Sequence, residues 1–181
     1  IGGRPYYVNV PNGLSGPSAP LLLALHGYTQ LPTDHEKVTG WSDVAVARHF
    51  IVAYPGTQPA RSAWDFAQGS KDVAYFREVV HDISRTWCVN QRQVHAEGHS
   101  SGALMAARLA CDGPAVFASV AVCAGVDPNL LGSPCVPDRP IGVGIFHGIA
   151  DPISDFPRAV QHRNNWLFRN GCPLTPTTEP H

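Results

Sequence analysis

Continuous apolar runs, without polar alternation, are the main feature of the chain's hydropathy pattern. Such runs are typical of strands that are buried on both faces of a parallel sheet. Several of them stop at a His-Gly or Pro-Gly pair, which indicates that the chain turns at the end of the strand. Six segments are therefore predicted to be strands: Pro5–Pro11, Pro20–Gly27, Phe50–Gly56, Val94–Gly98, Phe117–Gly125 and Ile141–Gly148.

Segments with apolar residues three and four positions apart lie between these runs and predict amphipathic helices. They are Trp41–His49, Lys71–Trp87, Gly102–Cys111 and Pro157–Gly171. Strands that alternate with helices predict an α/β fold, with a doubly wound, mostly parallel sheet and helices on both faces. We expect residues 1–181 to form a single domain of this kind.

The amino-acid composition limits the kinds of partner that the protein is expected to bind. Of the 181 residues, 44% are hydrophobic and 15% are charged, which is typical of a globular domain, and the formal net charge is only −1. We therefore expect neither nucleic acid nor a membrane surface as a partner. The five cysteines include no C-x-x-C pair, which excludes the common zinc patterns. We expect disulfide bonds in a secreted, monomeric protein, with free thiols in a cytosolic protein as the alternative.

The candidate chemistry lies where a predicted strand turns sharply into a helix. Gly98-His99-Ser100-Ser101-Gly102 fits the G-x-S-x-G pattern, in which the serine projects above the sheet as a nucleophile. Glycine is expected at both flanks because a side chain there would meet the neighbouring strand or helix. Ser101 would contribute its backbone N–H to an oxyanion hole, and His99 would point away from Ser100, as a packing or pocket-wall residue. The alternative is that Ser100 only caps the helix.

The other catalytic groups are expected in loops that follow strands. Tyr28, just after the run that ends in His-Gly, is the candidate for the second backbone oxyanion donor, unless that loop is an ordinary turn. Asp151 follows the last predicted strand and is the candidate acid that would orient a histidine. Asp155 competes for that role, although its position before Pro157 suits a helix cap.

Together these motifs make the chain resemble a secreted esterase family, which includes polyhydroxybutyrate depolymerase-type enzymes, feruloyl esterases and acetyl xylan esterases. The resemblance implies an α/β-hydrolase fold, with Ser100 as nucleophile, Asp151 as acid, and Tyr28 and Ser101 as oxyanion donors. It also places Trp64 near the substrate cleft, with packing on a surface loop as the alternative. The matching stretches are LLLALHGYTQ, GWSDVAVARHFIVAYPG, DVAYFREVVHDI, CVNQRQVHAEGHSSGALMAARLAC, FASVAVCAG, FHGIADPI and NNWLFRNGC.

One part of the family pattern has no match. Family members continue past the NGC region into another strand, and the catalytic histidine follows it, so we expect a last strand, a helix and the base beyond residue 181. His147 is explained by its His-Gly turn, His162 is expected on a solvated helix face, and His181 is an alternative base. The family also implies a further cysteine that would pair with Cys172. Two bridges of open connectivity would then join the other four: Cys88, Cys111, Cys123 and Cys135.

The resemblance implies a serine carboxylic-ester hydrolase that works through an acyl-enzyme and needs neither metal nor cofactor. Its expected substrates are feruloyl or acetyl esters of plant polysaccharide, or polyhydroxyalkanoate-type polyesters. Two alternatives stay open at the level of the sequence. One is another serine hydrolase on the same fold, such as a peptidase or thioesterase, and the other is a non-catalytic binding module.

Overall fold

A computed structural model of the chain describes residues 2–14, 18–58, 61–113 and 115–175. A six-stranded sheet with the order β1-β3-β2-β4-β5-β6 forms its centre, and all neighbouring pairs are parallel except β1 with β3. The strands are β1 (Tyr6–Asn9), β2 (Ala19–Leu25), β3 (Ile51–Pro55), β4 (Val89–His99), β5 (Ser119–Cys123) and β6 (Gly142–Phe146). The helices are α1 (Pro32–Thr39), α2 (Trp41–Arg48), α3 (Lys71–Thr86), α4 (Ser101–Asp112), the 3-10 helix η1 (Pro128–Leu131) and α5 (Phe156–Arg169).

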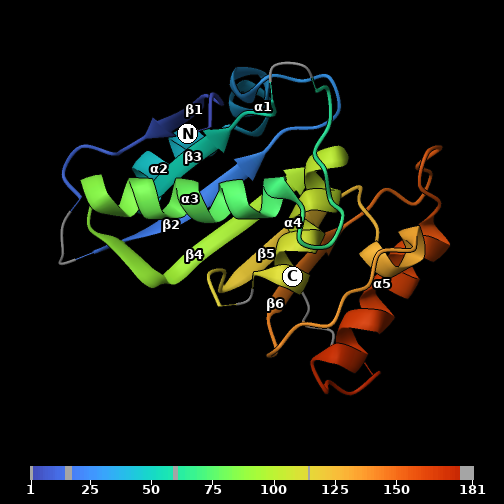
Figure 1. Cartoon of the computed structure of the whole chain (residues 1–181). Helices are drawn as coiled ribbons and strands as arrows, with labels where there is room; N and C mark the ends of the chain where they lie inside the picture. The colour runs from blue at the N-terminus through green and yellow to red at the C-terminus, as the bar shows by residue number, and fades with distance from the viewer. Residues whose placement is uncertain (1, 15–17, 59–60, 114, 176–181) are drawn as a thin grey trace.

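Strand β2 shows how the two faces of the sheet are covered. Leu21, Leu23 and Leu25 pack in one apolar cluster with the buried faces of α3 and α4, whereas Leu22 and Ala24 pack with α2 on the opposite face. Figure 1 shows α3 and α4 in front of the sheet, with α5 beside the β6 edge. A strand enclosed in this way needs apolar residues at every position, which explains the unbroken run in the sequence.

All six predicted strands and all four predicted helices are present, and the expected mostly parallel α/β sheet is confirmed. Two short elements were not predicted: the polar helix α1, which begins at Pro32, and the 3-10 helix η1. Strand β4 also begins five residues earlier than predicted, because Val89 already pairs with Ala19 of β2, before a register shift.

The cysteine prediction is only partly correct. Cys111 in α4 forms a disulfide with Cys135, whereas Cys88, Cys123 and Cys172 are free and exposed. A second bridge between Cys88 and Cys123 is ruled out by the topology. Cys88 precedes the amino end of β4, and Cys123 lies at the carboxyl end of the neighbouring parallel strand β5.

None of the helices in the described residues is both long and apolar enough to span a bilayer. Within the same residues, no group of three or more His, Cys, Asp or Glu side chains is gathered in a way that could hold a metal ion.

Candidate active site

The predicted site residues lie at one edge of the sheet, because parallel strands direct their carboxyl ends the same way. His99, Cys123 and Phe146, the last residues of β4, β5 and β6, are aligned across the sheet. The loops that follow β2, β4 and β6 carry Tyr28, Ser100 and Asp151, so these three residues share this edge. In open α/β sheets this is the edge where ligands bind.

Ser100 occupies the single residue between β4 and α4, and its backbone is strained. Its φ of 55° and ψ of −117° are rarely adopted by a residue with a side chain. The Ser100 N–H donates to the carbonyl of Cys123 at 3.0 Å, and its own carbonyl accepts from Leu104 at 3.1 Å. The Ser100 side chain makes no capping hydrogen bond to α4, so the helix-cap alternative is wrong.

The two flanking glycines allow strand, turn and helix to approach each other. A Cβ atom on Gly98 would lie 2.3 Å from the carbonyl carbon and oxygen of Gly102. A Cβ atom on Gly102 would lie 2.1 Å from the carbonyl oxygen of Leu25 in β2. Both contacts are with backbone atoms, which cannot turn aside as a flexible side chain could. Alanine at either position would therefore have to move the turn that carries Ser100.

The backbone N–H groups of the two predicted oxyanion donors, Ser101 and Tyr28, are available to a ligand. Ser101 is the first residue of α4, where N–H groups have no acceptor within the helix. Among the described residues, neither the Ser101 N–H nor the Tyr28 N–H donates to another protein group. The Tyr28 loop is fixed on both sides. The Gln30 Oε1 accepts from the Gly27 N–H at 2.8 Å, and the Thr29 N–H donates to Ser62 at 2.8 Å.

Trp64 lies below the site and not on the surface, so the surface-packing alternative is wrong. Its side chain is buried and packs against Phe76 and His26, with ring centroids at 5.1 Å and 4.9 Å. The indole N–H donates to the His26 carbonyl at 2.9 Å, and the backbone N–H of Trp64 donates to the Ser101 Oγ at 3.2 Å. Trp64 thus connects the Tyr28 loop, the start of α4 and the core.

Asp151 lies in the loop after β6, and its carboxylate is held by the backbone. The Asp151 Oδ1 accepts from the N–H groups of Ser154 and Ile153, at 3.0 Å and 2.8 Å. These hydrogen bonds favour the ionised form and lower the pKa of Asp151 below its usual value, with smaller contributions from His147 and His99. Asp155 occupies the N-cap position of α5, but its side chain makes no capping hydrogen bond.

No histidine among the described residues forms a hydrogen bond with Ser100. The His147 Nε2 lies 2.7 Å from the carbonyl oxygen of Ser154 and 3.8 Å from the Asp151 Oδ2. His162 is fully buried, so the expectation that it lies on a solvated helix face is wrong. It shares the inner face of α5 with Ala159 and Trp166, at helical spacing. His181 lies outside the described residues.

A cavity of about 650 Å³ opens beside Tyr28, and we refer to it as the Tyr28 cavity. Its volume is within the range of small-molecule sites in proteins. Its lining comes from Tyr28, from residues 61–67 and from residues 131–133. Trp64 and Tyr28 both border it, and the Trp64 N–H donates to the Ser101 Oγ, whereas Ser100, Ser101 and Asp151 are not among its lining residues.

The chain is similar to several curated esterases. It is 28% identical to a bifunctional acetylxylan esterase/xylanase of Neocallimastix patriciarum, over 98% of this chain and 26% of that protein. It is 30% identical to poly(3-hydroxyalkanoate) depolymerase C of Paucimonas lemoignei, over 68% of this chain and 32% of that protein. It is 24% identical to a probable feruloyl esterase C of Aspergillus niger, over 95% of this chain and 64% of that protein. The chain thus spans between a quarter and two thirds of the length of these relatives. No family model matches it.

Solved structures share the fold. An acetyl xylan esterase from Aspergillus awamori matches with a TM-score of 0.62 at 24% identity, over 67% of this chain and 47% of that one. A thermostable esterase matches with a TM-score of 0.71 at 17% identity, over 92% of this chain and 48% of that one. The α/β-hydrolase fold and the resemblance to this esterase family, both drawn from the sequence, are therefore confirmed.

Proposed function

We propose that this chain, an α/β-hydrolase similar to acetylxylan, feruloyl and polyhydroxyalkanoate esterases, carries the nucleophile of a serine carboxylic-ester hydrolase. The observation that carries the proposal is the strained backbone of Ser100 between two glycines that cannot hold a side chain. Such strain persists only where the surrounding structure enforces it, and it is typical of functional sites. Because the Ser100 hydroxyl does not cap α4, it is free to act on a ligand.

In the proposed reaction the Ser100 Oγ attacks the carbonyl carbon of an ester while a histidine takes the hydroxyl proton. The carbonyl oxygen becomes an oxyanion that accepts hydrogen bonds from the N–H groups of Tyr28 and Ser101. The tetrahedral intermediate then expels the alcohol, which receives the proton from the histidine. Water attacks the resulting acyl-enzyme in the same manner and releases the carboxylic acid.

The Tyr28 and Ser101 N–H groups suit this role because their orientation is set before substrate binds. The Ser101 N–H lies at the positive end of the α4 dipole, and the Tyr28 loop is held by Gln30 and Ser62. Donors that are already oriented stabilise the developing charge without a reorganisation cost, and one such donor typically contributes on the order of 10²–10³ in kcat.

We propose Asp151 as the acid that orients the base, and a histidine outside the described residues as the base itself. The backbone hydrogen bonds that lower the pKa of Asp151 keep it ionised at neutral pH, as an orienting carboxylate requires. His147 is not proposed as the base because its Nε2 is already engaged by the Ser154 carbonyl. His99 points toward Gly27, since a Cβ atom there would lie 3.3 Å from its Nδ1.

The proposed substrates are feruloyl or acetyl esters of plant polysaccharide, or polyhydroxyalkanoate-type polyesters. The relatives named for these activities support the proposal. We also propose that the protein is secreted and works as a monomer. The Cys111–Cys135 disulfide supports secretion, because such bonds persist in oxidising compartments.

The test compares Ser100→Ala with Ser84→Ala, which removes a hydroxyl on α3 that donates to the Val80 carbonyl and accepts from the Gln91 side chain. In the full-length protein, we expect Ser100→Ala to abolish hydrolysis of p-nitrophenyl acetate and Ser84→Ala to leave kcat/KM within twofold of wild type. Hydrolysis that survives Ser100→Ala would refute the assignment of the nucleophile. A folded wild-type protein that hydrolyses none of a panel of acetyl, feruloyl and hydroxybutyrate esters would favour a binding module.

A further inference from the structure

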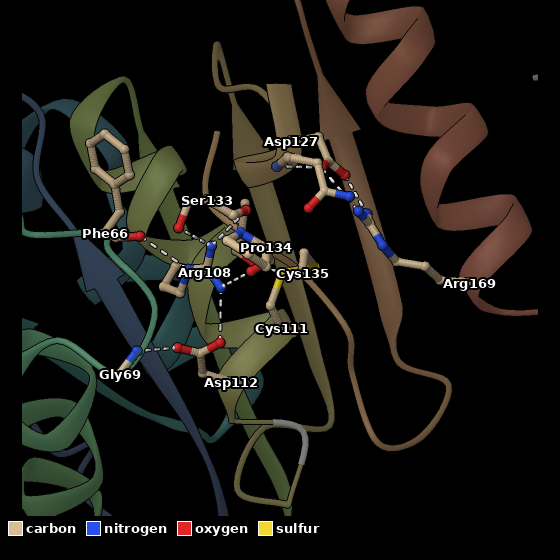
Figure 2. The surroundings of a disulfide bond; sticks show 12 residues. Phe66, Gly69, Arg108, Cys111, Asp112, Asp127, Ser133, Pro134, Cys135 and Arg169 are labelled. Atoms are coloured by element: carbon tan, nitrogen blue, oxygen red, sulfur yellow. Dashed lines mark hydrogen bonds and ion pairs between the residues drawn. A yellow bond between two sulfur atoms is a disulfide. The ribbon is translucent and has the colours of Figure 1, made fainter. Parts of the chain in front are cut away.

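Arg108 is a fully buried cation two turns after Ser101 in α4, and its guanidinium joins two segments of the Tyr28 cavity lining. Its Nε donates to the Phe66 carbonyl at 3.0 Å. Its Nη2 donates to the Ser133 Oγ at 2.7 Å and to the Ser133 carbonyl at 3.2 Å. Its Nη1 donates to the Pro134 carbonyl at 2.7 Å. Figure 2 shows the side chain between these two segments.

Other groups of α4 each hold one of the two segments. Asp112 accepts from the Gly69 N–H at 2.8 Å, which fixes the segment that contains Phe66. The Cys111–Cys135 disulfide fixes the segment that contains Ser133. Figure 2 shows the Gly69–Asp112 hydrogen bond and the Cys111–Cys135 disulfide near Arg108. Among these three α4 side chains, only Arg108 hydrogen-bonds to both segments.

The Ser133 segment is also held at its start. Asp127 is fully buried, caps η1 through the Asn129 N–H at 2.9 Å and pairs with Arg169 of α5. The part between Asp127 and Cys135 supplies residues 131–133 to the cavity. Between these two fixed ends, Arg108 holds the Ser133 side chain and carbonyl.

We propose that Arg108 is a positioning residue that sets the width of the Tyr28 cavity and thereby the selectivity of the enzyme for large over small esters. This inference rests on the proposed esterase function. The chemistry favours arginine for the task, because one planar guanidinium can donate to several acceptors in fixed directions. A lysine has a single nitrogen and cannot reach Phe66 and Ser133 with comparable geometry. Asp112, which accepts from Nη1 at 2.9 Å, supplies the counter-charge.

The test measures kcat and KM of full-length Arg108→Lys and Arg108→Gln for p-nitrophenyl acetate and for a bulky aromatic ester, methyl ferulate. The matched control is Arg77→Gln, because Arg77 donates to the Asp112 carbonyl but contacts neither segment of the lining. We expect kcat/KM for the bulky ester to fall on the order of tenfold in both Arg108 variants, mainly through KM, while the acetate value changes less than twofold. The ratio of the two values does not depend on how much of the protein is folded.

Amide hydrogen exchange gives a second readout that does not need activity. We expect the Arg108 variants to exchange faster in both residues 61–67 and residues 131–134, and Arg77→Gln to exchange like wild type. An unchanged ratio of the two kcat/KM values, or faster exchange in only one of the two segments, would overturn the proposal. Wild-type protein without Ser100-dependent hydrolysis would instead refute the proposed function, whatever the exchange shows.

A milder variant covers the case in which neither Arg108 variant folds. Ser133→Ala removes one acceptor of the guanidinium and leaves both backbone carbonyls in place. We expect the ratio of kcat/KM values to move in the same direction by about twofold to threefold, in line with the loss of one hydrogen bond. A ratio that stays at the wild-type value would overturn the proposal.

Discussion

The burial of His162 makes a quantitative prediction about stability and pH. The ring lies on the inner face of α5 and is fully buried. Burial penalises the charged form and lowers the pKa of His162 to about 4, although the Asp127 carboxylate and the Gly125 backbone favour protonation. Arg169 and His147 act in the same direction as burial. The pKa in the unfolded chain should be close to 6.5.

The sign of the effect follows from proton uptake. Between pH 6.5 and pH 4 the unfolded chain binds a proton at His162 and the folded protein does not, so the free energy of unfolding falls as the pH falls through this range. A shift of this size corresponds to about 3 kcal/mol, which is a large part of the stability of a typical domain. The contribution is fully present above pH 7 and is lost near pH 4.

The perturbation is His162→Leu, which keeps an apolar group of similar size on the inner face of α5. Urea unfolding, followed by tryptophan fluorescence, gives the free energy of unfolding at intervals between pH 4 and pH 8 for variant and wild type. We expect wild type to lose about 3 kcal/mol more than His162→Leu between pH 7 and pH 4. His81→Gln, which changes an exposed histidine of α3, should follow the wild-type curve. Parallel curves for wild type and His162→Leu would show that His162 does not take up a proton on unfolding in this pH range.

Three further changes test other parts of the structure. Gly102→Ala places a Cβ atom 2.1 Å from the Leu25 carbonyl, so we expect a loss of about 3 kcal/mol or more in urea unfolding; a loss below 1 kcal/mol would contradict the packing. Reduction of the Cys111–Cys135 bridge, whose residues are 24 apart, should cost about 3 kcal/mol in the same assay, whereas equal stability of both forms would refute this. Asp151→Asn should lower kcat/KM for p-nitrophenyl acetate on the order of 10²–10⁴-fold without lowering Tm by more than a few degrees, and unchanged kinetics would remove Asp151 from the mechanism.

The sheet could be predicted because its signal is local. Strands β2 and β3 at its centre are unbroken apolar runs, as burial on both faces requires. The turn at Ser100 could be predicted for the same reason, since the two glycines and the change from strand to helix lie within a few residues. Helix α1 was missed because its sequence is polar and short, and the cap geometry and Pro32 define it more than any apolar face.

The burial of several side chains could not be predicted, because it depends on contacts between residues that are far apart in the sequence. Trp64 lies in a polar loop without periodicity, and its burial depends on Phe76, which is twelve residues away, and on the His26 carbonyl. His162 and Arg108 were not recognised as buried, although a signal was present for both. His162 falls at helical spacing between Ala159 and Trp166, and Arg108 interrupts an otherwise apolar helix. A charged residue in such a position predicts a network of buried hydrogen-bond partners, which Arg108 has.

Labelling with a fluorophosphonate tests directly whether Ser100 is the nucleophile, because the probe reacts preferentially with a serine that is activated for attack. After treatment of the full-length protein, peptide mapping by mass spectrometry identifies the modified residue. We expect one adduct, on Ser100, that is absent in Ser100→Ala and present in Ser84→Ala. A folded wild-type protein that forms no adduct, or forms it on another residue, would show that Ser100 is not the nucleophile.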